Sequence, residues 1–376
     1  MTGLPSRERI RAFELAAGLS ILFMMLIHDL WHWGKPETWT STVGWAISLA
    51  GGPTATPTFL FVMGASLAFS PPWRFRTLAT RGLWLLFLGY LLNFLRGTLP
   101  AIVGTSVGLV TWQQIAPFTP WSLLTSVDLH HVAGLSLVAV AALSIRWRPG
   151  WPWLAAAAAV VLVQPWLRGL TFGTALLDGP LTPILGGAPN VFYAVVPWLA
   201  YALVGTVFGR VLATATDRRR VFRLGGLVGL GLIAVSGVLI LLTQPSFDVV
   251  TYWHGPPAFV IGIMGLVLIW LAICEAVTRS EWLNRRLRIV YFWSARVIPM
   301  YFTHWLVVGW GIAVVGFRDL DLSGVLIATP CGIVVTTLLS RFAVRLEEAP
   351  WRLIARRMAP ATASAAALNP AVVPDT

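Results

Sequence analysis

The chain has 376 residues, of which 57% are hydrophobic and only 11% are charged, so it carries more apolar surface than one water-soluble core can bury. This composition excludes a soluble globular protein and predicts that a lipid bilayer surrounds most of the chain. The formal net charge of +12 would indicate a nucleic-acid partner only if the basic residues shared one surface.

The basic residues instead recur in clumps along the chain. Between successive clumps lies enough apolar sequence for two membrane passes, as the positive-inside rule predicts for a chain that returns to the cytoplasm after each helical hairpin. We therefore expect cytoplasmic loops at the clumps, both termini in the cytoplasm, and no nucleic-acid partner. The clumps are Arg7 to Arg11, Arg74 to Arg81, Arg146 and Arg148, Arg210 to Arg223, Arg279 to Arg288, and Arg341 to Arg357.

A membrane-spanning helix needs about 20 mainly apolar residues, and the sequence supplies about ten such runs. The first follows basic residues as a signal sequence would, but it is long and has no small-residue cleavage site, so we expect it to remain as a helix. The fold class predicted is all-α, a polytopic integral membrane protein. The expected helices lie near 12–31, 42–69, 80–99, 127–145, 151–168, 190–212, 222–243, 256–277, 291–313 and 322–343.

The second run is too long for one straight span, and it contains Gly51, Gly52, Pro53 and Pro57. A broken or strongly kinked helix is expected there, and broken helices often line cavities. The semi-apolar segment 101–126 suits an interfacial or re-entrant stretch, which could cap a site.

The last part of the chain has a different composition. After Arg357 it consists mainly of Ala, Pro, Ser and Thr, which is too poor in large apolar residues to order itself. We predict a membrane domain over 1–346 and a disordered cytoplasmic tail over 347–376.

Ionisable side chains are expensive at membrane depth, so each is a candidate for function or for a buried pair. The predicted topology places every histidine in the outer half of a helix or just outside it. Several other polar residues share this level, which predicts a polar layer near the outer face. The histidines are His28, His32, His130, His131, His254 and His304, and the other residues are Asp29, Asn93, Arg96 and Asp128.

His28 and His32 are four residues apart, which places both imidazoles on one face of a continuous helix. A neutral imidazole could deprotonate an acceptor hydroxyl or carry an acyl group briefly. The alternative is an interfacial histidine that contacts a neighbouring helix. The same spacing suits a metal ligand pair, but no zinc motif surrounds it, and we expect no metal.

Asp128 precedes His130 and His131, so its carboxylate could orient an imidazole as in many general-base sites. The alternative is that Asp128 caps the start of a helix. Cys274 and Cys331 both lie in apolar runs, which indicates packing residues rather than a disulfide or a metal site.

Arginines also lie at the predicted cytoplasmic ends of helices. Arg76, Arg81 and Arg296 could bind a phosphorylated cofactor that docks from inside. The alternative for each is plain topological charge. Glu14 and Glu275 lie at the same level, and we expect them to pair with cytoplasmic arginines.

The residues from Arg11 to His28, RAFELAAGLSILFMMLIH, resemble the opening of the transmembrane acyltransferase superfamily. This superfamily includes acyltransferase family 3 and the relatives of heparan-alpha-glucosaminide N-acetyltransferase. Further segments resemble the same group in the same order along the chain. They are PTFLFVMGAS from Pro57, LGYLLN from Leu88, VPWLAYALVGTVFG from Val196, and the P-x-Y-x-x-H pattern of Pro299, Tyr301 and His304.

The resemblance implies a ten-helix enzyme that takes an acyl group from cytoplasmic acyl-CoA and delivers it across the membrane, usually to a sugar. It assigns His28 to the position of the functional histidine of acyltransferase family 3. That family usually carries Asp-x-x-Arg-Gly in the first helix, whereas this chain reads Glu14-x-x-Ala17-Gly18. Either another arginine takes over the role of the missing one, or the activity has changed.

Together these features predict an acyl-CoA-dependent O- or N-acyltransferase of the cell envelope, with acetyl-CoA as donor and a sugar, glycan or glycolipid as acceptor. We expect it in the plasma (inner) membrane, where a homodimer is one possible form. The predicted site combines His28, His32, Asp128 and His131 with donor binding by Arg76, Arg81 and Arg296. The alternatives are a transporter or flippase, and a non-catalytic relative of the enzyme family.

Overall fold

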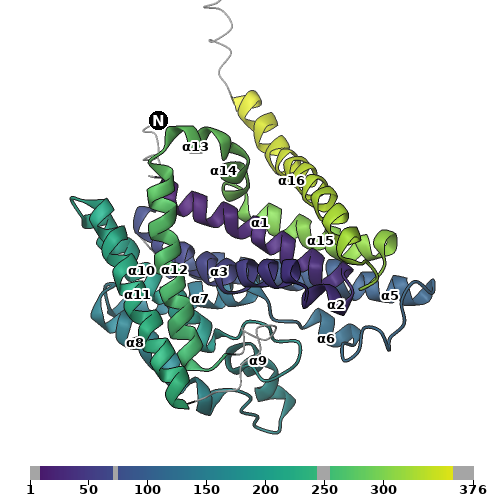
Figure 1. The fold of residues 1–376 in the computed structure, drawn as a ribbon, viewed down its shortest axis with the longest axis horizontal. Coiled ribbons are helices and arrows are strands. Elements are labelled where there is room, and N and C mark those ends of the chain that lie inside the picture. The colour runs from purple at the N-terminus through teal and green to yellow at the C-terminus, as the bar shows by residue number, and fades with distance from the viewer. Residues whose placement is uncertain (1–8, 71–74, 244–254, 359–376) are drawn as a thin grey trace, which may run out of the picture.

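The computed structural model describes residues 9–70, 75–243 and 255–358. These residues form helices joined by short connections (Figure 1). Two isolated bridges, Gly34 with Leu320 and Val127 with Val191, are the only strand-like pairings among them. The all-α prediction is therefore confirmed for the described part of the chain.

Nine helices in the described residues are long and apolar enough to cross a membrane. A shorter apolar helix, α8 (Trp151–Leu167), completes the ten that the sequence predicts. The nine are α1 (Arg11–Trp33), α3 (Thr42–Ser66), α4 (Phe75–Asn93), α7 (Leu129–Arg146), α10 (Val195–Thr214), α11 (Arg218–Thr243), α12 (Pro257–Thr278), α15 (Val297–Val315) and α16 (Leu322–Met358).

Short helices and turns join the long ones. α13 lies near the first described residues, at the top of Figure 1, whereas α2, α5, α6 and α9 lie toward the opposite end. The short elements are α2 (Pro36–Trp39), the 3₁₀ turn η1 (Leu67–Phe69), the π-helical turn η2 (Phe94–Thr98), α5 (Leu99–Ser106), α6 (Pro120–Leu124), α9 (Ala175–Leu185), α13 (Glu281–Arg286) and α14 (Arg288–Ser294).

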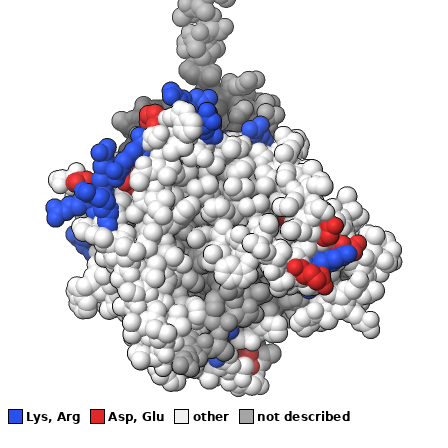
Figure 2. Space-filling view, viewed as in Figure 1, with Lys and Arg blue, Asp and Glu red and all other residues white. Residues whose placement is uncertain are grey.

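Lysine and arginine side chains gather at one end of the molecule, on the same side as the start of α1 and α13 (Figure 2). Two contacts there each join segments that are far apart in the sequence. Arg11 donates to Glu281 at 2.7 Å, and the Arg218 guanidinium lies 5.7 Å from the ring centre of Phe69. We call this the arginine-rich end, and the positive-inside rule predicts that it faces the cytoplasm.

The predicted break in the second helix is wrong, because α3 runs without interruption from Thr42 to Ser66. Gly51 instead serves close packing, since a Cβ atom there would lie 2.8 Å from the Phe23 carbonyl oxygen of α1. Neighbouring helices in a membrane bundle can compensate for helix-breaking residues within a span. Gly51, one of the residues that predicted a break, is therefore a packing position against α1.

Three further boundaries differ from the predicted ones. The predicted helix 291–313 is divided, because α14 ends at Ser294 and α15 begins at Val297. The predicted start at 190 moves to Val195, since Val191 pairs with Val127 in an extended bridge. α16 continues to Met358, beyond the predicted domain end at 346. Residues 359–376 lie outside the described residues, so the disordered tail stays a prediction.

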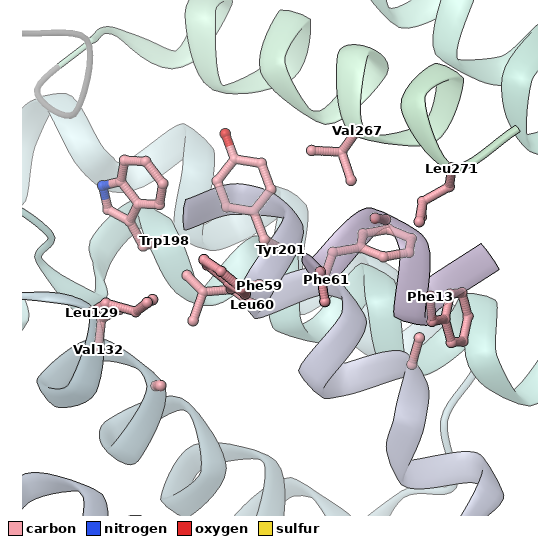
Figure 3. Packing of buried hydrophobic residues seen from close by; sticks show 14 of the residues in the cluster. Phe13, Phe59, Leu60, Phe61, Leu129, Val132, Trp198, Tyr201, Val267 and Leu271 are labelled. Atoms are coloured by element: carbon pink, nitrogen blue, oxygen red, sulfur yellow. The ribbon is translucent and has the colours of Figure 1, made fainter. Parts of the chain in front are cut away.

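The core lies where α1, α3, α7, α10 and α12 meet (Figure 3). Large side chains fill it, including the fully buried Phe61, Leu203 and Tyr201, whose hydroxyl donates to the Val260 carbonyl oxygen at 3.2 Å. Lipid-facing helices such as α11 expose most of their apolar side chains. α1 packs against α3, α12, α14, α15 and α16, so its polar residues can meet side chains from several helices.

Close packing of α10 on α3 gives a testable prediction. A Cβ atom at Gly205 would overlap the carbonyl oxygen of Phe61, whereas one at Gly231 on α11 meets nothing within 4 Å. We expect Gly205→Ala to lower the free energy of unfolding by about 1–3 kcal/mol, as overpacking does. Thermal unfolding in detergent measures this, with Gly231→Ala as the matched control. Equal midpoints for the two variants would contradict the packing seen here.

Candidate functional site

His28 lies in the second half of α1, away from the arginine-rich end, and meets aromatic rings of α15. Its ring centre lies 4.0 Å from that of Trp305 and 5.5 Å from that of His304. His32 is one turn further along, and its Nδ1 atom donates to the His28 carbonyl oxygen at 2.9 Å. The helix therefore persists through both histidines, as their shared face requires.

A buried ion pair lies beside this group. Arg96 donates to the Asp128 carboxylate at 2.8 Å, and the two side chains are only 8% and 9% exposed. Arg96 also donates to the Asn93 side-chain oxygen at 3.1 Å. The Asn93 amide in turn donates to the carbonyl oxygens of Leu124 and Ser126. The pair thus ties the end of α4 to the start of α7.

Asp128 is the N-cap of α7, which confirms the capping alternative. Its carboxylate accepts the Leu129 backbone N–H at 2.7 Å, and the Nδ1 atom of His131 accepts the Asp128 backbone N–H at 3.2 Å. Because this nitrogen is an acceptor, a neutral His131 carries its proton on Nε2. The carboxylate is paired with Arg96, so the predicted orientation of an imidazole by Asp128 is not what the structure shows.

His130 and His131 point to different neighbours. The His130 ring centre lies 4.6 Å from that of Tyr301 on α15, and that of His131 lies 4.5 Å from Tyr90 on α4. Gly89 allows the second approach, since a Cβ atom there would lie 2.7 Å from His131. One turn of α7 therefore bridges α4 and α15.

Many polar atoms of this group have no hydrogen-bond partner among the described residues. Buried polar groups are normally paired, so the group has unused capacity to bind water or a polar ligand. We call the residues that carry these atoms, His28, Arg96, His130, His131 and His304, the histidine cluster. The unpaired atoms are His28 Nδ1, Arg96 Nη1, His130 Nδ1, His131 Nε2, and both ring nitrogens of His304.

A cavity of about 710 Å³ leads to the cluster from the arginine-rich end. Residues of α1, α3, α4, α7 and α15 line it, and most of them are apolar. The end of the cavity nearest the arginine-rich end is lined by Arg9, Glu14 and Arg81. The opposite end, which we call the cavity tip, is lined by His130 and Tyr301. Arg9 and Glu14 form an ion pair at 2.7 Å, which confirms the predicted pairing of Glu14 with a nearby arginine.

The three predicted donor-binding arginines differ in whether they line this cavity. Arg81 lines the cavity, whereas Arg76 and Arg296 do not. Arg296 instead lies over the Phe292 ring at 4.2 Å. Ala17, where the related acyltransferases carry arginine, does line the cavity.

His28, His32, His131 and Asp128 form the layer next to the cavity tip and are not among its lining residues. Sequence reasoning did not single out Trp305, although it directly follows His304. The Trp305 ring contacts His28, and the Arg96 guanidinium lies over the same ring. Both contacts depend on the register of α15 against its neighbouring helices, which no local sequence pattern shows.

Two other polar features lie away from the cluster. Asp29 is fully buried and faces α16, where a Cβ atom at Gly332 would lie 3.3 Å from its Oδ2 atom. His254 lies outside the described residues. Within the described residues, no group of three His, Cys, Asp or Glu side chains is placed to hold a metal ion.

Comparison with known proteins identifies the family. The family model described as heparan-alpha-glucosaminide N-acetyltransferase, catalytic, matches residues 9–224. The match covers more than half of the chain and includes His28, the Arg96 and Asp128 pair, and His130. A search of curated proteins found no match. The chain therefore belongs to the family of heparan-alpha-glucosaminide N-acetyltransferase catalytic domains, and is a multi-pass membrane protein of the transmembrane acyltransferase superfamily.

Proposed function

We propose that the chain transfers an acyl group, acetyl in the first instance, from acyl-CoA at the arginine-rich end to a hydroxyl or amine at the opposite face. The acceptor is a sugar, an envelope glycan or a glycolipid, and the membrane is the plasma (inner) membrane. The cavity between the arginine-rich end and the histidine cluster carries this proposal, because it offers a donor a route to buried imidazoles.

The donor enters the cavity from the arginine-rich end. Guanidinium groups pair well with phosphate. Arg9 and Arg81, at the end of the cavity nearest the arginine-rich end, therefore hold the phosphates of CoA. The lining from Phe59 to Ser66 along α3 spans about 10 Å at 1.5 Å per residue, and Leu67 and Phe69 of η1 extend it toward the arginine-rich end. This length carries the thiol arm inward and brings the thioester to His130 and Tyr301.

The transfer needs one base and one donor to the carbonyl oxygen. The acceptor oxygen or nitrogen attacks the thioester carbon, the new C–O or C–N bond forms, and the C–S bond breaks. His28 takes the proton of the acceptor, or relays the acyl group, from the acceptor side of the cluster. The Tyr301 hydroxyl donates to the carbonyl oxygen at the cavity tip. The CoA sulfur takes one proton from water in the cavity and leaves through the cavity, while His28 releases the acceptor proton to water on the acceptor side, so that one proton is taken up and one is released.

The missing family arginine has a substitute in this arrangement. Ala17 lines the same cavity as Arg9 and Arg81, so positive charge reaches the donor path from α4 and from the residues before α1. This favours a rebuilt donor site over a decayed one.

The first prediction concerns His28. Purified full-length protein in detergent, given radiolabelled acetyl-CoA and glucosamine, should release CoA and label the amine. We expect His28→Ala to lower the transfer rate about 10²–10⁴-fold, the usual contribution of a general base. Ser136→Ala, on α7 and outside the cavity lining, is the control and should keep the wild-type rate.

A transporter would give a different result in the same preparation. No CoA release with any glycan, amine or lipid acceptor, together with sugar movement across liposomes, would refute the proposed reaction. A His28→Ala rate equal to that of the wild type would remove His28 from the mechanism and leave the enzyme proposal to His130.

The second prediction concerns the donor site. Arg81→Ala should raise the KM for acetyl-CoA about tenfold, since a charge-assisted hydrogen bond contributes about 1.5–3 kcal/mol, and should change kcat little. Arg76→Ala removes the same charge from the same helix outside the cavity, and should leave KM unchanged. Ala17→Arg in the Arg81→Ala background should restore part of the affinity. Equal KM values for Arg76→Ala and Arg81→Ala would contradict this donor path.

A further inference from the structure

Trp305 stands between the cavity and His28. Tyr301, one turn nearer the arginine-rich end, lines the cavity tip, and its ring centre lies 6.4 Å from that of Trp305. On its other side the Trp305 ring lies 4.0 Å from His28 and 5.3 Å from His32. Neither His28 nor Trp305 is among the described residues that line the cavity. The indole therefore lies between the cavity tip and the two histidines of α1.

Arg96 holds this indole in place. Its guanidinium carbon lies 3.9 Å from the ring centre of Trp305, within the range of a cation–π contact. The guanidinium cannot easily turn away, because Asp128 and the Asn93 side chain both accept hydrogen bonds from it. Arg96, Trp305 and His28 form one stack.

The backbone around Arg96 brings its side chain close to α15. Arg96 lies in the π-helical turn η2, a form that often marks functional sites in helices. α15 approaches the turn closely, because a Cβ atom at Gly309 would overlap the Arg96 carbonyl oxygen. The Trp310 indole N–H donates to the Leu95 carbonyl oxygen at 3.0 Å. Two contacts thus fix α15 against the turn on the outer side of Trp305.

We propose that Arg96 is a positioning residue that clamps Trp305 as a partition between the donor cavity and the acceptor side of the cluster. The partition itself rests on the geometry above, while its purpose rests on the proposed function. A closed partition keeps outer water from the thioester, and the indole moves only when an acceptor occupies the cluster. Closed sites commonly prevent such side reactions.

Loss of the partition has a defined chemical consequence. Water then attacks the thioester carbon in place of the acceptor, a C–O bond forms and the C–S bond breaks. One proton of the water passes to the CoA sulfur, and the second is released as the carboxylic acid ionises. The products are free carboxylate and CoA, formed without any acceptor.

Accessibility from the two membrane faces tests the partition without relying on activity. Ala133 lines the cavity one turn from His130, so Ala133→Cys reports on the donor compartment. Cys331 is exposed and is replaced in Cys331→Ser, while Cys274 is buried. In vesicles, a membrane-impermeant maleimide should label the cysteine introduced by Ala133→Cys from the arginine-rich side only.

Adding Arg96→Lys or Trp305→Ala should make the cysteine about tenfold more reactive from the opposite side, because the indole loses a stacking partner or is removed. Arg96→Lys keeps the charge beside Asp128, so folding is retained. Arg318→Lys is the matched control, since Arg318 also lies over a tryptophan, Trp39, at 4.8 Å but on the outer surface. Unchanged labelling in both test variants, or labelling of the parent from both sides, would overturn the partition.

Acceptor-independent CoA release from acetyl-CoA is the second measurement. We expect it to rise severalfold in Arg96→Lys and Trp305→Ala while transfer to glucosamine falls, so that the ratio of hydrolysis to transfer increases. A residue with only a structural role would lower both rates together, and that result would refute the shielding role. A wild-type chain without CoA turnover but with the labelling pattern above would refute the proposed function and leave the partition standing.

Discussion

The ion pair between Arg96 and Asp128 is the interaction on which the site depends. Each charge would be very expensive at membrane depth on its own, and removing one partner of a buried pair costs about 3–5 kcal/mol. The pair therefore fixes the end of α4 against the first turn of α7. That turn presents His130 to the cavity and His131 to α4, while the guanidinium face is left for Trp305. One electrostatic contact thus sets the positions of both sides of the site.

The site consists of a cavity that reaches toward the arginine-rich end and the histidine cluster beyond it, and this arrangement suits the proposed transfer between two faces. The cavity has mainly apolar walls, with Arg9 and Arg81 near the arginine-rich end, which suits the proposed donor with its phosphates. The cluster beyond it has ring nitrogens without partners, which suits an acceptor with several hydrogen-bonding groups. A single open channel would join both sides and admit water to a reactive thioester. In the proposed partition, one aromatic ring held between the mainly apolar cavity and the polar cluster separates the two.

The long apolar helices and the arginine-rich end were readable from the sequence, because arginine clumps and apolar runs are local signals, while the orientation in the membrane stays a prediction. The same reasoning failed where the outcome depends on neighbours. Gly51 predicts a break when α3 is considered alone, yet it packs against Phe23 of α1. Likewise, His28 and His32 could be placed on one face by spacing, but the contact of His28 with Trp305 requires the register of α15 on α1. The cavity is lined by five separate long helices, so no local pattern could predict it.

Two adjacent residues of the first-helix motif, Ala17 and Gly18, face different neighbours. This explains how one position of the motif can change while the next is kept. Gly18 lies against α14, where a Cβ atom would overlap the Val290 carbonyl oxygen. Ala17 is its direct neighbour and faces the cavity. The glycine is required by packing whatever the donor chemistry is, whereas the side chain at position 17 affects only what the cavity holds. In the proposed donor site, Arg81 on the same cavity supplies the positive charge that position 17 lacks, and the contact of α1 with α14 is unaffected. The motif can therefore lose its arginine while the helix that carries His28 keeps its place.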